Sequence, residues 1–166
     1  MTIISPYGTG TVITHADAFR VNNSFTGNVN PITNFERVDS DSFNRIGDGM
    51  NLSSGTFSFP VTGIWQITCI GSFYAGSGYR SRYNGVEMLA TTDNSSYGNC
   101  ARFYCNLGTN YGTGYSSGIC RHIFDVGNIS THKIRFMTEV EYSGVGFDAG
   151  TSNSQNLIQF VRLGDT

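Results

Sequence analysis

Two segments of the chain alternate between apolar and polar side chains. In residues 64–73 the apolar positions are Trp65, Ile67, Cys69 and Phe73, and the polar positions between them include Gln66, Thr68 and Ser72. In residues 133–142, Ile134, Phe136, Val140 and Tyr142 alternate with Lys133, Arg135, Glu139 and Glu141. A period of two puts successive side chains on opposite faces of a β-strand. We therefore expect two strands here, each with one face on the core and the other in water.

Shorter segments with the same period predict further strands. One face of residues 101–107 would carry Ala101, Phe103, Cys105 and Leu107, and one face of residues 119–126 would carry Cys120, His122, Phe124 and Val126. The segment 157–163 is apolar on both faces, which is typical of a strand at the centre of a sheet or against another subunit. No segment has the period of a helix. The predicted fold class is therefore all-β, with two packed antiparallel sheets in Greek-key order.

The first 30 residues differ in pattern from the rest. They are rich in Thr, Asn and Gly with scattered apolar residues, whereas regular strand signals begin after Pro31. We therefore divide the chain into an N-terminal arm, residues 1–30, that could anchor the protein, and one β-sandwich domain, residues 31–166. A chain of 166 residues is long enough to bury one such core.

Charge and composition exclude several classes of partner. Only 13% of the residues are charged, the formal net charge is -2, and the ten basic residues, of which Lys133 is the one lysine, are dispersed. Without a basic run to neutralise phosphates, we expect no nucleic-acid partner. No apolar run approaches the roughly 20 residues of a transmembrane helix, so we expect no membrane insertion. Residues 1–4 lack the features of a signal peptide, so we expect synthesis in a cytoplasm.

The four cysteines show neither paired spacing nor a histidine partner at zinc-binding intervals. We interpret Cys69, Cys100, Cys105 and Cys120 as reduced, small apolar core residues. A bridge between Cys100 and Cys105, or between Cys69 and Cys120, is the alternative.

One motif runs through residues 34–65. It consists of Asn34-Phe35-Glu36-Arg37-Val38, a polar loop, and Gly55-Thr56-Phe57-Ser58-Phe59-Pro60-Val61-Thr62-Gly63-Ile64-Trp65. This stretch resembles the globular head of the first complement component, which belongs to the tumour-necrosis-factor-like (TNF-like) jelly rolls. The positions that match the family pattern in order are Phe35, Val38, Gly55, Phe57, Pro60, Gly63 and Trp65. Physically these are fold determinants, because the glycines supply turn backbone, the proline ends strand pairing and the aromatic rings fill the sandwich.

The resemblance extends, with departures, towards the end of the chain. Phe124-Asp125-Val126-Gly127-Asn128 is similar to the family's leucine-x-x-glycine-aspartate turn, with Asn128 in place of the aspartate, and Gln159 stands where the family's closing strand has a glycine. The resemblance implies a TNF-like jelly roll that assembles as a homotrimer about a threefold axis. It places the predicted subunit interface on the closing strand, at Leu157, Ile158, Phe160 and Val161.

No pattern of reactive residues predicts catalysis. There is no Gly-x-Ser-x-Gly elbow and no His-Glu-x-x-His helix, and the three histidines are dispersed. Asp39, Asp41 and Asp48 share one loop but lack EF-hand spacing, and we interpret them as solvated turn carboxylates instead of a cation site. We therefore predict a non-enzymatic protein without catalytic residues, cofactor or metal.

Tyrosine is concentrated in one region of the chain. Seven of the nine tyrosines lie in residues 74–115, among Gly, Ser and Asn. Rigid aromatic rings among adaptable polar residues bind protein or sugar surfaces well. The predicted recognition surface consists of Tyr79, Arg80, Arg82, Tyr83, Tyr111 and Tyr115.

Two functions fit these features. Proteins with the TNF-like fold include secreted recognition modules and, in viruses of bacteria, head-decoration and fibre proteins. The first hypothesis is a structural protein of a bacteriophage virion, made in the host cytoplasm, that contacts capsid or fibre subunits through trimeric jelly-roll surfaces. The alternative is a recognition module, an adhesin or tail-fibre tip, that binds host glycan or protein through the tyrosine-rich loops.

Overall fold

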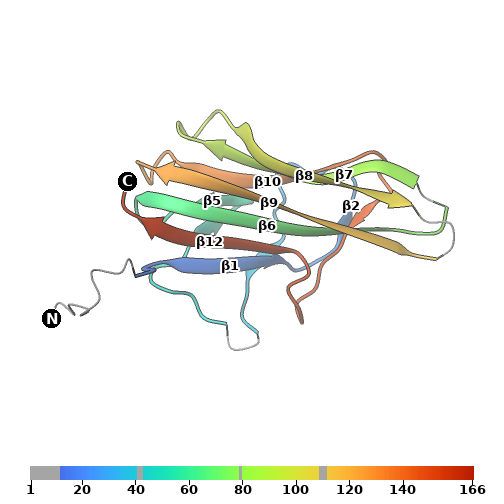
Figure 1. Cartoon of the computed structure of the whole chain (residues 1–166), viewed down its shortest axis with the longest axis horizontal. Coiled ribbons are helices and arrows are strands. Elements are labelled where there is room, and N and C mark those ends of the chain that lie inside the picture. The colour runs from blue at the N-terminus through green and yellow to red at the C-terminus, as the bar shows by residue number, and fades with distance from the viewer. Residues whose placement is uncertain (1–11, 41–42, 79, 109–111) are drawn as a thin grey trace.

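The structure is a computed structural model that describes residues 12–40, 43–78, 80–108 and 112–166. All regular structure in this part of the chain is β. The strands form two antiparallel sheets that pack face to face, and the longest strands run along the long axis of the molecule (Figure 1). This arrangement confirms the predicted all-β class with two antiparallel sheets.

The larger sheet is built around one long strand, β6 (Gly63–Ala75). Strand β9 (Gly114–Val126) pairs with β6 along its whole length, and β12 (Leu157–Gly164) and β11 (Gly146–Phe147) pair with it in turn. Beyond β12 lie β1 (Ala16–Val21) and β3 (Phe35–Arg37), and beyond β11 lies β2 (Phe25–Thr26). Strand β9 therefore forms one edge of this sheet, and β3 and the short β2 are the outermost strands on the other side.

The smaller sheet has five strands. Their order across the sheet is β4 (Asn51–Ser53), β5 (Thr56–Ser58), β10 (Lys133–Val140), β7 (Arg80–Thr91) and β8 (Gly98–Gly108). The alternation predicted for residues 133–142 holds within β10, where Ile134, Phe136, Thr138 and Val140 are buried and the residues between them are partly exposed. It fails at Tyr142, which is 46% exposed because β10 ends at Val140.

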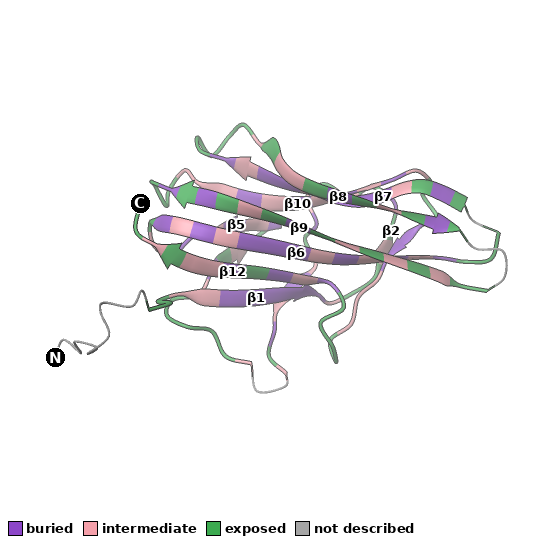
Figure 2. Ribbon diagram, in the orientation of Figure 1, coloured by how far each residue is buried: buried purple, intermediate pink, exposed green. Residues whose placement is uncertain are grey.

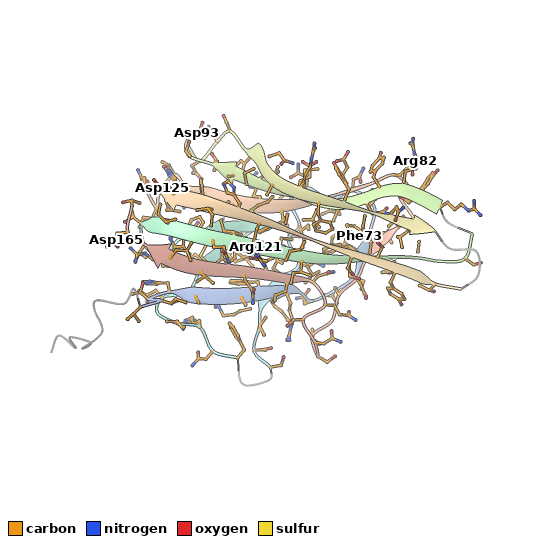
Figure 3. The ribbon with its side chains drawn as sticks, viewed as in Figure 1. Phe73, Arg82, Asp93, Arg121, Asp125 and Asp165 are labelled. Carbon is orange, nitrogen blue, oxygen red and sulfur yellow. The ribbon has the colours of Figure 1, made fainter. Side chains whose placement is uncertain are left out.

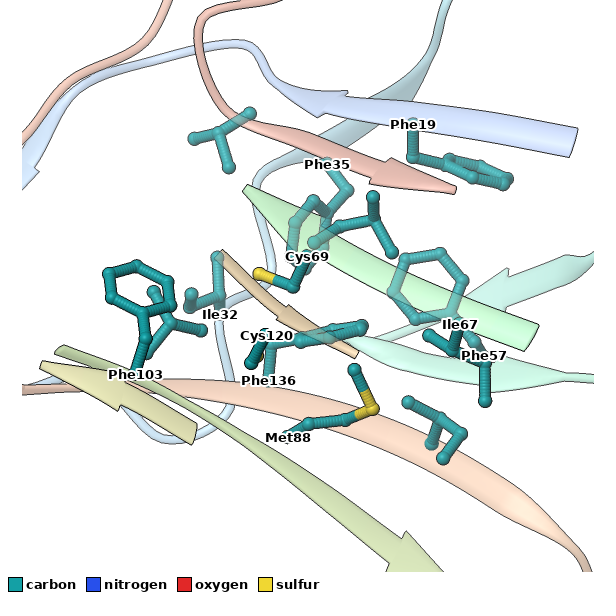
Figure 4. Close-up of a cluster of buried hydrophobic side chains, with 14 of the residues drawn as sticks. Phe19, Ile32, Phe35, Phe57, Ile67, Cys69, Met88, Phe103, Cys120 and Phe136 are labelled. Atoms are coloured by element: carbon teal, nitrogen blue, oxygen red, sulfur yellow. The ribbon is translucent and has the colours of Figure 1, made fainter. Parts of the chain in front are cut away.

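Aromatic rings from both sheets fill the core between them (Figure 4). Phe57, which has no exposed surface, stands in edge contact with Phe19 at 5.0 Å, Phe35 at 5.2 Å and Phe136 at 5.8 Å between ring centroids. Trp65 is 1% exposed and packs against Phe59 at 5.2 Å. Edge-to-face rings at such distances stabilise a core beyond the apolar area that they bury. The aromatic residues of the family-like motif thus lie at the centre of the sandwich.

Two glycines of the same motif have backbone conformations that other residues rarely adopt. Gly55 has φ of 75° in the turn between β4 and β5, and Gly63 has φ of 136° at the start of β6. A Cβ atom on Gly63 would collide with the carbonyl oxygen of Gly164 across the sheet. Pro60 lies in the bend between β5 and β6, where no ladder hydrogen bond is needed.

The boundary expected at residue 30 is wrong for residues 16–30. Strand β1 pairs with both β12 and β3, and its Phe19 and Val21 are each 2% exposed in the core. Two charged residues in β1 hide its apolar pattern in the sequence. Asp17 and Arg20 are 4% and 2% exposed. Arg37 neutralises Asp17 and Glu36 neutralises Arg20, and both partners lie on β3. The β-sandwich domain therefore includes residues from Ala16 onwards.

Candidate interaction surface

Strand β9 presents an apolar row to solvent. Its even-numbered residues Cys120, Phe124 and Val126 are buried, whereas the odd-numbered ones point to the outer face of the larger sheet (Figure 2). Among the latter, Tyr115 is 65% exposed, Ile119 50% and Ile123 53%. Side chains of this size are usually buried when a chain needs no partner, although single exposed ones are normal.

The strand register makes this row part of a wider surface. Ile119 stands opposite Ile70 on β6, which in turn stands opposite Leu157 on β12. Four residues further along β9, Ile123 lies opposite Gln66, and Gln66 lies opposite Val161. Apolar groups from three neighbouring strands thus share the outer face of the larger sheet, which we call the β9–β6–β12 face.

Polar groups divide and border the β9–β6–β12 face. Arg121 and Asp125 alternate with the isoleucines along β9 (Figure 3), and Arg121 stands opposite Thr68. Near the start of β9, the Ser117 hydroxyl donates to the Ser72 hydroxyl of β6 at 3.2 Å. An apolar patch with polar groups at its margins has the composition of a protein contact surface.

Of the four residues predicted for the subunit interface on β12, two are buried inside the chain itself and two are partly exposed. Ile158 and Phe160 are 3% and 0% exposed in the core of the chain itself, where Phe160 meets Phe57 at 5.1 Å, so neither is available to a second subunit. Leu157 and Val161 point the other way and belong to the β9–β6–β12 face. An apolar strand at the centre of a sheet buries only one face within its own sandwich, and the sequence does not say which one.

A small pocket lies at the β1 side of the same face. It has a volume of about 220 Å³, and its lining comes from β1, β12 and the loops beside them: Ala18, Val38, Ser40, Phe43, Ser154, Leu157 and Gln159. The β9–β6–β12 face therefore has a protruding row on β9 at one side and a hollow beside β1 at the other.

The predicted recognition surface is divided by the fold. Tyr79 and Tyr111 lie outside the described residues. Tyr115 packs against Tyr74 at 6.2 Å on the larger sheet, whereas Tyr83 packs against Tyr104 at 5.9 Å on the smaller one. The start of β7, which carries Tyr83, and the start of β9, which carries Tyr115, lie near the same end of the molecule (Figure 1), but the two tyrosines do not share one continuous face.

The two arginines of that surface line a cleft of about 380 Å³ at the same end. The other lining residues are Ser81, Asn106, Leu107 and Gly108. Arg82 is itself held by Glu141, which accepts from the Arg82 backbone N–H and from its Nε, each at 2.6 Å. The backbone hydrogen bond, followed by the guanidinium, lowers the pKa of Glu141. Arg80 and Arg82 thus line one cleft, while Tyr83 and Tyr115 lie on different sheets.

A polar cluster on the outer face of the smaller sheet has no counterpart in the sequence predictions. The Tyr104 hydroxyl donates towards Glu87 and Glu139, while Arg102 lies 3.6 Å from Glu87 and 5.4 Å from the Tyr104 ring. Burial, followed by these two hydrogen bonds, raises the pKa of Tyr104. Because the groups satisfy one another, the cluster resembles a structural network more than a vacant catalytic site.

The groups that could carry chemistry are dispersed among the described residues. No cluster of three or more His, Cys, Asp or Glu side chains there could hold a metal ion. His122 and His132 flank the ring of Phe124 at 5.9 and 5.6 Å, and His15 lies 6.0 Å from Trp65. In the acidic loop, Asp39 pairs with Arg20 at 2.7 Å, Asp48 is exposed, and Asp41 lies outside the described residues. No helix capable of crossing a membrane occurs in the described ranges.

Comparison with known proteins finds similarity in structure but not in sequence. No protein-family model and no curated protein sequence matches the chain. Crystal structures of murine APRIL at pH 5.0 and at pH 8.5 are similar to it, with TM-scores of 0.54 and 0.50. In both cases the identity is 13%, over 90% of this chain and 98% of the APRIL chain. These neighbours are TNF-family jelly-roll proteins, so the chain has a TNF-like jelly-roll fold.

Proposed function

We propose that the protein is a non-enzymatic structural component of a bacteriophage virion, a capsid-decoration or fibre protein that works as a homotrimer. The observation that carries this proposal is the apolar row on β9, where Tyr115, Ile119 and Ile123 are half or more exposed on a regular sheet face. Exposed side chains of this kind across neighbouring strands stabilise an assembly when a second copy covers them.

The arrangement of the β9–β6–β12 face favours a ring of copies. A threefold ring needs two different, complementary patches on each subunit, because every copy meets its neighbours through one patch on each side. The protruding β9 row and the hollow beside Phe43 and Leu157 are two such patches on one sheet face. We propose that the β9 row of one copy packs on the β1 side of the next.

The virion role is supported by composition and by fold. A jelly roll with 13% charged residues and one lysine depends on amides, hydroxyls and buried aromatic rings, which suits permanent packing against other subunits. Such a protein would stabilise a particle by binding only its assembled state. Its partners would be capsid or fibre subunits, and it would enter the virion after synthesis in the host cytoplasm.

The assembly surface can be tested with two matched substitutions. Ile119→Asp puts a charge on the β9 row, and Ile129→Asp puts one on a side chain of similar exposure, 43% against 50%, in the turn between β9 and β10. In sedimentation velocity, Ile119→Asp should dissociate the trimer and Ile129→Asp should not. If both variants sediment like the unsubstituted protein, the β9 row is not the subunit contact.

Particle binding requires a separate test. Removing residues 1–30 would delete β1 and its core residues Phe19 and Val21, so the deletion must stop before Ala16. We expect a chain lacking residues 1–11 to remain trimeric but to lose binding to purified particles. If the shortened chain still binds the particles, these residues are not the anchor.

The alternative function is recognition of a host glycan or protein, and the cleft beside Arg80 and Arg82 favours it. Its residues lie next to the Tyr83 and Tyr104 pair, which supplies aromatic surface. Replacing Arg80 and Tyr83 with Ser should then abolish binding to host cells without dissociating the trimer, because neither residue lies on the β9–β6–β12 face. Unchanged cell binding by this variant would reject the recognition role of this cleft.

A further inference from the structure

Two of the four cysteines face each other across neighbouring strands. Cys69 on β6 and Cys120 on β9 are directly opposite in the antiparallel register. Both side chains point into the core, where Cys69 is 0% and Cys120 7% exposed, and both are free thiols (Figure 4). Their thiols are hydrogen-bonded to each other.

We propose that Cys69 and Cys120 form a disulfide when the protein meets a small-molecule disulfide oxidant such as oxidised glutathione. Residues directly opposite in an antiparallel pair have Cα atoms about 4.5 or 5.5 Å apart. Both spacings lie within the roughly 4.4–6.8 Å range of disulfides, and opposite residues share one face of the sheet. The bond can therefore form without a change of strand register.

The environments of the two thiols give them different roles. Burial raises the pKa of Cys69, whereas the hydrogen bond from Cys69 lowers the pKa of Cys120. Cys120 also lies on an edge strand and keeps some exposure, so it is the thiolate that attacks the oxidant. Attack on one sulfur of the oxidant gives a mixed disulfide on Cys120 and releases one small thiol. Cys69 then loses its proton and attacks the Cys120 sulfur, which releases the second small thiol.

The exchange is balanced in atoms and electrons. Two protein thiols and one oxidant disulfide become one protein disulfide and two small thiols, and two electrons pass to the oxidant. No metal or protein cofactor is needed.

The other two cysteines provide controls. Cys100 and Cys105 lie on the same strand, β8, and five residues of extended chain separate their Cα atoms by about 16 Å, too far for a bridge. Their thiols donate to backbone carbonyls instead, Cys100 to Met88 at 3.3 Å and Cys105 to Asn84 at 3.4 Å. Burial raises the pKa of both thiols, that of Cys100 to about 11, which makes them poor nucleophiles.

The bond would fasten the strand that carries Ile119 and Ile123 to the centre of its sheet. It would also close residues 70–119 into a covalent loop, which restricts the unfolded chain more than the folded one. The pairing does not depend on the proposed function. In a virion protein, it would convert a subunit folded in a reducing cytoplasm into a more stable one after release.

The experiment uses the full chain with Cys100→Ser and Cys105→Ser, so that only the pair remains. After incubation with oxidised glutathione, the intact mass should fall by two hydrogens, and a non-reducing tryptic map should join residues 46–80 to residues 103–121. The melting temperature should rise by roughly 8–16 °C, the shift expected for a loop of this length in a chain of this size, and a dithiol reductant should reverse it.

Three results would overturn the proposal: both thiols still titrate after denaturation, glutathione remains attached to one cysteine, or the disulfide joins two chains. Because the double serine variant could fold poorly, the unsubstituted protein is mapped in parallel. There, a disulfide that involves Cys100 or Cys105 would contradict the assignment, and a link between Cys69 and Cys120 would support it.

Discussion

The buried ion pair between Asp17 and Arg37 should be one of the most sensitive points of the fold. The Asp17 side chain is 2% exposed, and its carboxylate accepts from Arg37 Nε at 3.0 Å, from the Met50 backbone N–H at 2.8 Å and from the Ala18 backbone N–H at 2.9 Å. Arg37 also donates to the Met50 carbonyl at 2.8 Å. One carboxylate thus joins β1, β3 and the loop that leads to β4.

Asp17→Ala should remove the carboxylate and so leave Arg37 Nε and the backbone N–H groups of Met50 and Ala18 without this acceptor. Breaking a buried pair by deleting one partner typically costs about 3–5 kcal/mol, because the remaining groups stay buried without partners. The Arg37 side chain is 36% exposed and can regain water, whereas the Met50 N–H is buried. We therefore expect a loss near the lower limit, about 3 kcal/mol, which corresponds to a fall in melting temperature of roughly 6–12 °C.

Urea unfolding followed by the fluorescence of Trp65, the single and fully buried tryptophan, measures this loss directly. The matched control is Asp165→Ala, which breaks an Asp–Arg pair whose carboxylate is 92% exposed, and which should leave the unfolding midpoint unchanged. If Asp17→Ala costs less than about 1 kcal/mol, the pair behaves like a surface pair and our account of β1 is wrong.

Three further predictions concern other contacts. Gly118→Val should destabilise the protein by about 1–3 kcal/mol in urea unfolding, because a Cβ there would collide with the Phe103 ring, whereas Gly98→Ala, with open space around it, should not. Burial lowers the pKa of His122 in the folded state, so the unfolded chain takes up this proton first and stability should fall as the pH drops below about 6.5; melting curves of His122→Asn should show a smaller slope in that range. In an alkaline titration followed by tyrosine absorbance, the raised pKa of Tyr104 should give a step above the usual range of tyrosine, and Tyr104→Phe should remove this step.

Alternation of apolar and polar residues was sufficient to predict the strands that have one wet face. Strands β6 and β10 follow this pattern, and their apolar sides form the core. Strand β7 was not predicted, because its register with β8 shifts between Ser81 and Asn84 and again between Met88 and Leu89, which interrupts the period. A bulge of this kind depends on the partner strand and leaves no local signal.

The candidate surface was only partly predictable from the sequence. Ile119 and Ile123 stand four residues apart on the otherwise polar face of β9, and this was a signal that could have been found. The inward orientation of Ile158 and Phe160 could not be predicted, because both faces of β12 are apolar and only the packing of the two sheets distinguishes them. Asp17 and Arg20 could not be assigned to a strand either, since the side chains that neutralise them are 16 to 20 residues away in the chain.

The central claim is that copies of this chain assemble through the β9–β6–β12 face. Its most direct test is the absolute mass of the full-length protein by light scattering after size exclusion, across a series of concentrations. The account predicts about three times the chain mass of 18.1 kDa at every concentration. A mass equal to that of one chain throughout the series would contradict the trimer and the assembly role proposed for it.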